Sequence, residues 1–213
     1  MKIMALTDIH GRVNYPETII SQLRGADLVL IAGDITNFGD REDADAVIRS
    51  LTAVNCRILG IPGNCDRSGV TTALQAASID LHAKCRIIDN TLFFGIGGCN
   101  KTPFHTPLEY SEDEIAAILQ SFCTSSETKH TIIISHSPPH RTKLDRMFLG
   151  VHVGSKSLRT FIEEKQPDLV LCGHIHEARG FDRIGRTLII NPGVFPRHYA
   201  LINSNDNLDF ELR

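Results

Sequence analysis

Short apolar runs alternate with segments of helical periodicity through the first half of the chain. Residues 3–6, 28–32 and 58–61 form apolar runs too short for helices, and each leads within two residues into Asp, Gly or Pro. Such runs predict buried strands. Between them, apolar residues recur at i, i+3, i+4 and i+7, which predicts helices with one buried face. The alternation is typical of an α/β protein.

Local signals predict where the helices begin. Asp40 and Ser111 are favourable N-cap residues, and Ser111 opens a Ser-x-x-Glu capping box. Pro16 suits the first turn of an earlier helix, because proline lacks the N–H that this turn leaves unpaired. Further helical spacing begins at Val70 and at Leu158.

The second half of the chain adds strands and two turns. Residues 132–135, 169–172 and 188–190 are apolar runs that predict strands, and polar residues at 89–90 and 205–207 separate alternating runs. These two polar turns predict antiparallel hairpins. The chain thus combines strands that alternate with helices and strands that pair in antiparallel hairpins. This combination, with helices on the outside, indicates two packed mixed β-sheets flanked by helices.

Side chains of the types that bind metals follow several of these strands. They are Asp8 with His10, Asp34, Asn64, His136, and His174 with His176. We expect the i, i+2 pairs to point the same way along the pleat. Any one of these residues alone is typical of a turn, a helix cap or a satisfied core position. Because ligands bind beyond the carboxyl ends of strands in α/β sheets, the whole set predicts one metal centre.

The motifs D-x-H, G-D, G-N-x-D, an isolated His and G-H-x-H, in this order, resemble those of the calcineurin-like metallophosphoesterases. The resemblance spans residues 8–193 and implies a four-layer sandwich with two divalent metal ions that share an attacking hydroxide. It further implies that Asp8, His10 and His176 hold one metal, that Asn64, His136 and His174 hold the other, and that Asp34 bridges both. The donors are nitrogen and oxygen atoms, so Mn, Fe, Zn and Ni are all compatible and the sequence does not choose among them; Mn²⁺ is our first expectation.

Cys65 departs from the commonest form of the family pattern, which has histidine there as a proton donor. The G-N-C-D sequence resembles a small bacterial and archaeal branch whose members tend to prefer phosphodiesters. Cys65 is therefore a candidate catalytic residue. A thiol could donate a proton, ionise and bind metal, or serve as a small packing residue, and the sequence leaves these alternatives open.

Two long polar segments, residues 97–110 and 137–154, are rich in Pro, Thr, His and Gly. Loops of this length in a compact domain tend to be functional, so we expect them to rim the site. The first loop resembles the corresponding loop of the same branch, which makes His105 a candidate proton donor and Asn100 a candidate substrate-binding residue. His140 in the second loop is a candidate for binding phosphate.

Length and composition narrow the class of protein. The chain has 213 residues, so we expect a single domain that spans residues 1–213. A formal net charge of −3 gives no general attraction for nucleic acid or anionic lipid. The apolar runs are shorter than the ~20 residues of a membrane span, and we see no secretory signal. The six cysteines form no C-x-x-C pair, so we expect reduced thiols and a cytoplasmic protein.

The sequence thus predicts a metal-dependent phosphoester hydrolase that acts on a small-molecule phosphate ester, with phosphodiesters favoured. A phosphomonoesterase is the alternative within enzymes, and a non-catalytic interaction module of the same fold is the alternative from another class. A repair nuclease is disfavoured because the chain has no basic run. Self-association to a homo-oligomer is left open.

Overall fold

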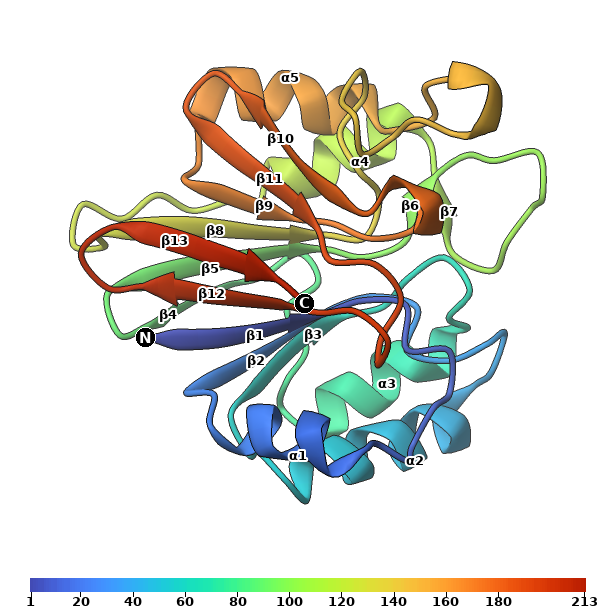
Figure 1. Ribbon diagram of the computed structural model, residues 1–213. Coiled ribbons are helices and arrows are strands. Elements are labelled where there is room, and N and C mark those ends of the chain that lie inside the picture. Colours follow the sequence, from blue (N-terminus) through green and yellow to red (C-terminus); the bar gives the residue numbers. More distant parts are fainter.

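In the computed structural model, which describes residues 1–213 apart from the side chain of Leu149, two β-sheets pack face to face (Figure 1). The first sheet has the order β13-β12-β1-β2-β3, formed by Leu208–Leu212, Ala200–Ser204, Lys2–Leu6, Leu28–Ala32 and Ile58–Ile61. The second has the order β10-β11-β9-β8-β5-β4, formed by Gly180–Ile184, Thr187–Asn191, Leu169–Leu171, His130–Ser135, Thr91–Ile96 and Cys85–Ile88. A two-stranded ribbon, β6 (Cys99–Asn100) with β7 (Glu109–Tyr110), lies in the first long loop. The prediction of two mixed sheets is confirmed.

Helices cover the outer face of each sheet (Figure 1). The first sheet is covered by α1 (Glu17–Arg24), α2 (Arg41–Thr52) and α3 (Ser68–Ala76), and the second by α4 (Glu112–Leu119) and α5 (Lys156–Lys165). Short 3-10 helices occur at Phe148–Gly150 and His176–Ala178. The predicted capping box is present at the start of α4, and Asp40 is the N-cap residue of α2 as predicted, where it also forms a capping box with Asp43. Among the described residues, we find no helix with the length and apolar character needed to cross a bilayer.

The continuous apolar character of the central strands follows from burial on both faces. In β1, Ile3 and Ala5 pack into the core between the two sheets, whereas Met4 and Leu6 pack against the helices of the first layer. Alternate residues of one strand therefore enter two different cores. This four-layer arrangement leaves the carboxyl ends of the strands free to carry polar side chains.

Both predicted hairpins are present. β4 pairs with β5 and β12 pairs with β13, each antiparallel. Asp89 and Asn90, which connect β4 to β5, have φ values of 45° and 61°. Aspartate and asparagine tolerate this left-handed conformation better than most residues, which explains why the pair was a reliable turn signal.

The expectation of six reduced cysteines is wrong for one pair. Cys85 in β4 and Cys123 after α4 form a disulfide, while Cys56, Cys65, Cys99 and Cys172 are free. The two bonded residues are 38 positions apart and meet because α4 packs beside the second sheet. Spacing along the sequence carries no signal for such a contact.

Candidate metal centre

The polar residues predicted from the strand ends meet at one edge of the two sheets. They follow β1, β2 and β3 of the first sheet, and β8 and β9 of the second. Within each sheet these strands run parallel to one another, so their carboxyl ends point the same way. The face-to-face packing then brings both sets of loops together.

Asp8, His10 and His176 form the first group of this cluster. Their ligand atoms lie within 4.8 Å of one another. The Nε2 atoms of His10 and His176 are 3.3 Å apart, and His176 Nε2 lies 3.2 Å from Asp8 Oδ1. Two ring nitrogens at this distance need a shared proton or a cation between them, and a carboxylate beside them favours the cation.

His136 and Asn64 form the core of the second group. The Nδ1 atom of His136 donates to the carbonyl of Ala32 at 2.8 Å, which fixes the ring and directs Nε2 into the site. There Nε2 lies 2.9 Å from the amide oxygen of Asn64. The ring of His174 packs edge-on against that of His136, with centroids 5.3 Å apart.

Asp34 stands between the two groups. One carboxylate oxygen, Oδ1, lies 3.3 Å from His136 Nε2, and the other, Oδ2, lies 3.9 Å from His10 Nε2. Its Oδ1 also accepts the backbone N–H of Cys65 at 2.9 Å, which holds the carboxylate in this orientation. A single side chain thus presents one oxygen to each half of the cluster.

The backbone of the cluster is unusual. Asp8, His10, Asp34 and His174 all have positive φ values, between 48° and 68°. Non-glycine residues rarely adopt this conformation, and such residues gather at functional sites. The expectation that a strand pleat aligns Asp8 with His10 is therefore wrong. β1 ends at Leu6, and turns rather than a pleat aim the two side chains.

Glycines beside the cluster permit the close approach of its elements. A Cβ on Gly63 would lie 2.1 Å from Asp34 Oδ1, and a Cβ on Gly173 would lie 1.9 Å from Thr7 Oγ1 and 2.8 Å from Asp8 Oδ2. No side chain fits at either position. The glycines of the G-N and G-H motifs thus make room for the carboxylates.

The protonation states follow from burial and neighbouring charge. Burial alone would raise the pKa of Asp8, but the hydrogen bond with His176 and the charges of His136 and His176 lower it to about 2. Burial, together with the charge of His136, lowers the pKa of His174 to about 4. Ionised Asp8 and neutral His174 are in the forms that bind metals. The carboxylates of Asp8 and Asp34 outweigh burial and raise the pKa of His136 and His176, so these two rings would release a proton when a cation binds. With that release, the donor set fits two divalent cations.

Asp66, the last residue of the G-N-C-D motif, holds the cluster together. Its fully buried carboxylate accepts hydrogen bonds from the backbone N–H groups of Ile35, Thr36 and Gly63 and from the Thr36 hydroxyl, at 2.7–3.0 Å. These contacts tie the loop after β2, which carries Asp34, to the loop after β3. The role of Asp66 is not evident from the sequence, because a carboxylate that binds backbone N–H groups and one that binds metal look alike there.

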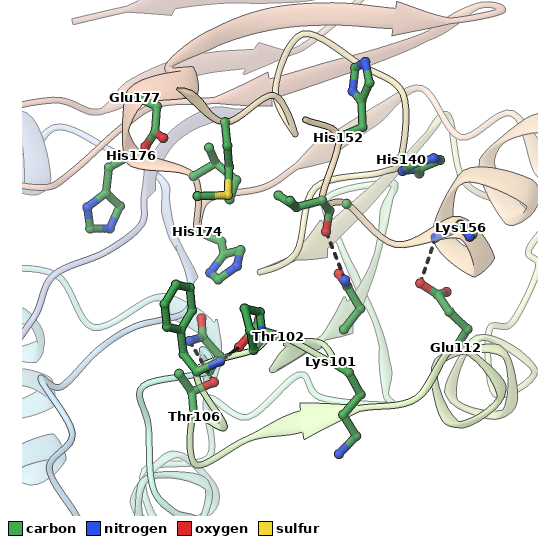
Figure 2. A pocket seen from close by; sticks show the side chains of 18 residues that line it. Lys101, Thr102, Thr106, Glu112, His140, His152, Lys156, His174, His176 and Glu177 are labelled. Atoms are coloured by element: carbon green, nitrogen blue, oxygen red, sulfur yellow. Dashed lines mark hydrogen bonds between the residues drawn. The ribbon is translucent and has the colours of Figure 1, made fainter. Parts of the chain in front are cut away.

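A cavity of about 640 Å³ opens beside the cluster (Figure 2). His174 and His176 lie on its left side in Figure 2, and His140 and His152 lie on its right. The two long loops line this cavity, as predicted. His140 is one of the residues that line the cavity. His105 is exposed and is not among the described lining residues.

Asn100 and Cys65, two further candidates, also lie in this region. Asn100 lines the cavity, but its amide links the two loops by donating to Val153 O at 2.9 Å and accepting from Ser137 Oγ at 2.6 Å. Cys65 is half-buried, and its Sγ lies within 4.8 Å of ligand atoms of His10 and Asp34. Burial and the Asp34 carboxylate raise the pKa of this thiol well above its usual range.

Comparison with known proteins identifies the family. Residues 1–178 match the model of the calcineurin-like phosphoesterases, and the chain belongs to this family. Such membership supports a metal-dependent phosphoester hydrolase. The chain is 38% identical over 214 residues to the uncharacterized protein MJ1162 of Methanocaldococcus jannaschii, with 98% of this chain and 94% of that protein covered.

Solved structures share the fold at low sequence identity. A dimetal phosphatase from Danio rerio superposes with a TM-score of 0.66 and 12% identity, covering 100% of this chain and 96% of that one. An archaeal phosphodiesterase superposes with a TM-score of 0.54 and 17% identity, covering 100% of both chains. These likenesses establish the metallophosphoesterase fold, while one neighbour is a phosphatase and the other a phosphodiesterase.

Proposed function

We propose that the protein is a dinuclear metal-dependent phosphodiesterase that acts on a small molecule. The observation that carries this proposal is the position of Asp34, which presents one carboxylate oxygen to His136 and the other to His10. An ionised carboxylate placed in this way can bridge two cations. In the proposal Asp8, His10 and His176 hold one ion, Asn64, His136 and His174 hold the other, and Asp34 holds both.

Two divalent ions at these positions would supply the positive charge that activates water and stabilises the phosphoryl oxygens during in-line displacement. The chain's own part is to orient the donors. Ala32 fixes the ring of His136 through its carbonyl, and Cys65 fixes Asp34 through its backbone N–H. Mn²⁺ is the metal we propose first; the imidazole, carboxylate and amide donors accept it as they accept Fe, Zn and Ni.

The preference for diesters rests on charge and on the proton donor. A phosphodiester carries one negative charge and a phosphomonoester about two, so a monoester site benefits from extra cations. The described cavity lining includes Lys101 and Lys156 but no arginine, and Lys101 Nζ already donates to the carbonyl of Glu109. A Cys65 thiol is also a weaker acid than the imidazole usual in the family. His105 and His140 are the other candidate donors.

Hydrolysis of two substrates with the same leaving group tests the proposal. Chelated protein receives Mn²⁺, Fe²⁺, Zn²⁺ or Ni²⁺, and hydrolysis of bis(p-nitrophenyl) phosphate is compared with that of p-nitrophenyl phosphate, with bound metal measured in parallel. We expect two ions per chain, no activity without metal, and a higher kcat/KM for the diester. A higher value for the monoester would indicate a phosphatase instead. Bound metal without any hydrolysis would favour the interaction module.

The cytoplasm is the proposed location, although the cysteines support it only in part. Four free thiols fit a reducing compartment, whereas the Cys85–Cys123 disulfide fits an oxidising one. Trapping of free thiols at the moment of cell lysis tests the location. A disulfide fully formed inside the cell would contradict it.

A further inference from the structure

Two exposed apolar side chains reach the cavity from different loops. Phe104 in the first long loop is 74% exposed and Met147 in the second is 37% exposed, and both line the cavity beside the metal centre. Pro103, Val153 and Ile175 add further apolar surface to the same lining. Exposed apolar groups that line a concave site usually mark the place where an apolar partner is bound.

The loop that carries Phe104 is held firmly. The Glu109 carboxylate accepts hydrogen bonds from the backbone N–H and the hydroxyl of both Thr102 and Thr106, at 2.6–3.1 Å. Phe104 N–H in turn donates to Thr102 Oγ1 at 3.1 Å. Thr106 Oγ1 also accepts from the amide of Asn64 at 3.1 Å, so the loop is fixed relative to the candidate metal ligands.

The second loop is fixed in a similar way. The buried Asp145 carboxylate accepts the backbone N–H groups of Arg141, Thr142 and Gly154 at 2.8–3.0 Å, and it bonds His152 Nδ1 at 2.7 Å. Asn100 bridges the two loops. Phe104 and Met147 therefore lie on two loops that are held in place by hydrogen bonds. Their exposed positions are part of the ordered structure of the cavity.

Two polar side chains of this lining, those of Asn100 and Thr102, are already hydrogen-bonded within the protein. Both ends of the Asn100 amide are bonded within the protein, and Thr102 Oγ1 donates to Glu109 while it accepts from Phe104. Such groups have little capacity left for hydrogen bonds to a ligand. Next to Phe104, the lining therefore offers a ligand mainly apolar contact.

We propose that Phe104 and Met147 bind an apolar organic substituent of the phosphate ester, an alkyl chain or an aryl ring, while the metal centre binds its phosphoryl group. The inference rests on the proposed function, because it takes the phosphoryl group to lie at that centre. The cavity of about 640 Å³ falls within the range of ~300–1,000 Å³ found for drug-sized ligands, far more than a phosphate alone requires. The substrate class is thus a phosphodiester with one apolar arm.

Binding of ligands whose single ester bond has a poor leaving group, methoxide, tests this inference with little turnover. The probes are the O-methyl esters of methyl-, butyl- and octylphosphonic acid, which carry one negative charge and differ in apolar length alone. Their affinity for the Mn²⁺-loaded protein is measured by titration calorimetry. Complete burial strengthens binding by up to about fourfold per methylene, so we expect a two- to fourfold gain per methylene from methyl to butyl.

The variants Phe104→Ala and Met147→Ala should each weaken binding of the octylphosphonate probe at least fivefold. Binding of the methylphosphonate probe should stay unchanged. Phe181→Ala is the matched control, because Phe181 is an exposed phenylalanine that packs on Phe210 outside the cavity lining. Thermal unfolding checks that all variants fold.

Affinity that does not depend on chain length, equal loss for the short and long esters, or no binding of any ester would overturn the inference. The proposed function fails differently. If binding shows the chain-length dependence but no diester is hydrolysed, the apolar arm stands and the phosphodiesterase proposal is contradicted. If diesters are hydrolysed but binding ignores chain length, the apolar arm alone is wrong.

Discussion

Removal of the Asp66 carboxylate should destabilise the fold and disturb the metal centre together. Asp66→Ala leaves three buried backbone N–H groups, at Ile35, Thr36 and Gly63, without an acceptor. An unsatisfied buried donor costs about 1–3 kcal/mol, and neighbouring losses do not add fully. We therefore expect the free energy of unfolding to fall by about 3–5 kcal/mol. Because these bonds tie the Asp34 loop to the Asn64 loop, metal affinity should fall as well.

Urea denaturation of the metal-free protein measures the change in the free energy of unfolding. Metal content after dialysis measures the change in metal affinity. Asp66→Asn keeps the shape and one acceptor oxygen, so it should lose about half as much stability as Asp66→Ala. Asp209→Ala removes an exposed aspartate on β13 and should stay within about 0.5 kcal/mol of the unchanged chain.

Two results would refute this reasoning. If Asp66→Ala unfolds at the same urea concentration as the unchanged chain, the hydrogen bonds to Asp66 do not stabilise the fold. If the variant is destabilised but retains metal like the unchanged chain, Asp66 does not position the ligands.

Three further predictions concern single side chains. Asp34→Asn removes the bridging charge but keeps the shape, so the variant should fold normally and bind metal at least about tenfold more weakly, as measured by metal titration. Cys65→His introduces a stronger acid, so it should raise monoesterase relative to diesterase activity by about tenfold on alkyl esters, with little change on p-nitrophenyl esters. The hydrogen bonds from Thr102 and Thr106 outweigh burial and lower the pKa of Glu109 to about 2, so the stability that Glu109 gives its loop is complete above about pH 4.5 and declines as the pH falls toward 2. Hydrogen exchange of the Thr102 and Thr106 backbone amides measures this loss of stability, and their exchange should become faster as the pH falls. In Glu109→Gln, the faster exchange should already be present at neutral pH.

Each of these predictions has a clear negative result. Unchanged metal affinity in Asp34→Asn would exclude the bridging role. An unchanged activity ratio in Cys65→His, at equal metal content, would move the search for the proton donor to His105 and His140. Equal exchange in Glu109→Gln and the unchanged chain would show that the loop is held by other contacts.

The sequence by itself determined most of the helices and strands and the order of the candidate ligands, but not β10 or the ribbon of β6 and β7. Buried strands such as Leu28–Ala32 are visible because burial on both faces leaves a short run that is apolar throughout. Helix starts at Asp40 and Ser111 are visible because capping is a contact between neighbours in the chain. Hydrophobic periodicity and capping are local, so they can be read without the fold.

The tertiary structure decided the features that depend on contacts between distant segments. The left-handed backbone of Asp8 and Asp34 is imposed by the turns and sheets around them, not by local preference. The disulfide between Cys85 and Cys123 and the shared cavity lining of Phe104 and Met147 join residues that are distant in sequence. Such contacts follow from how the two sheets and their loops pack, so no local pattern in the sequence records them.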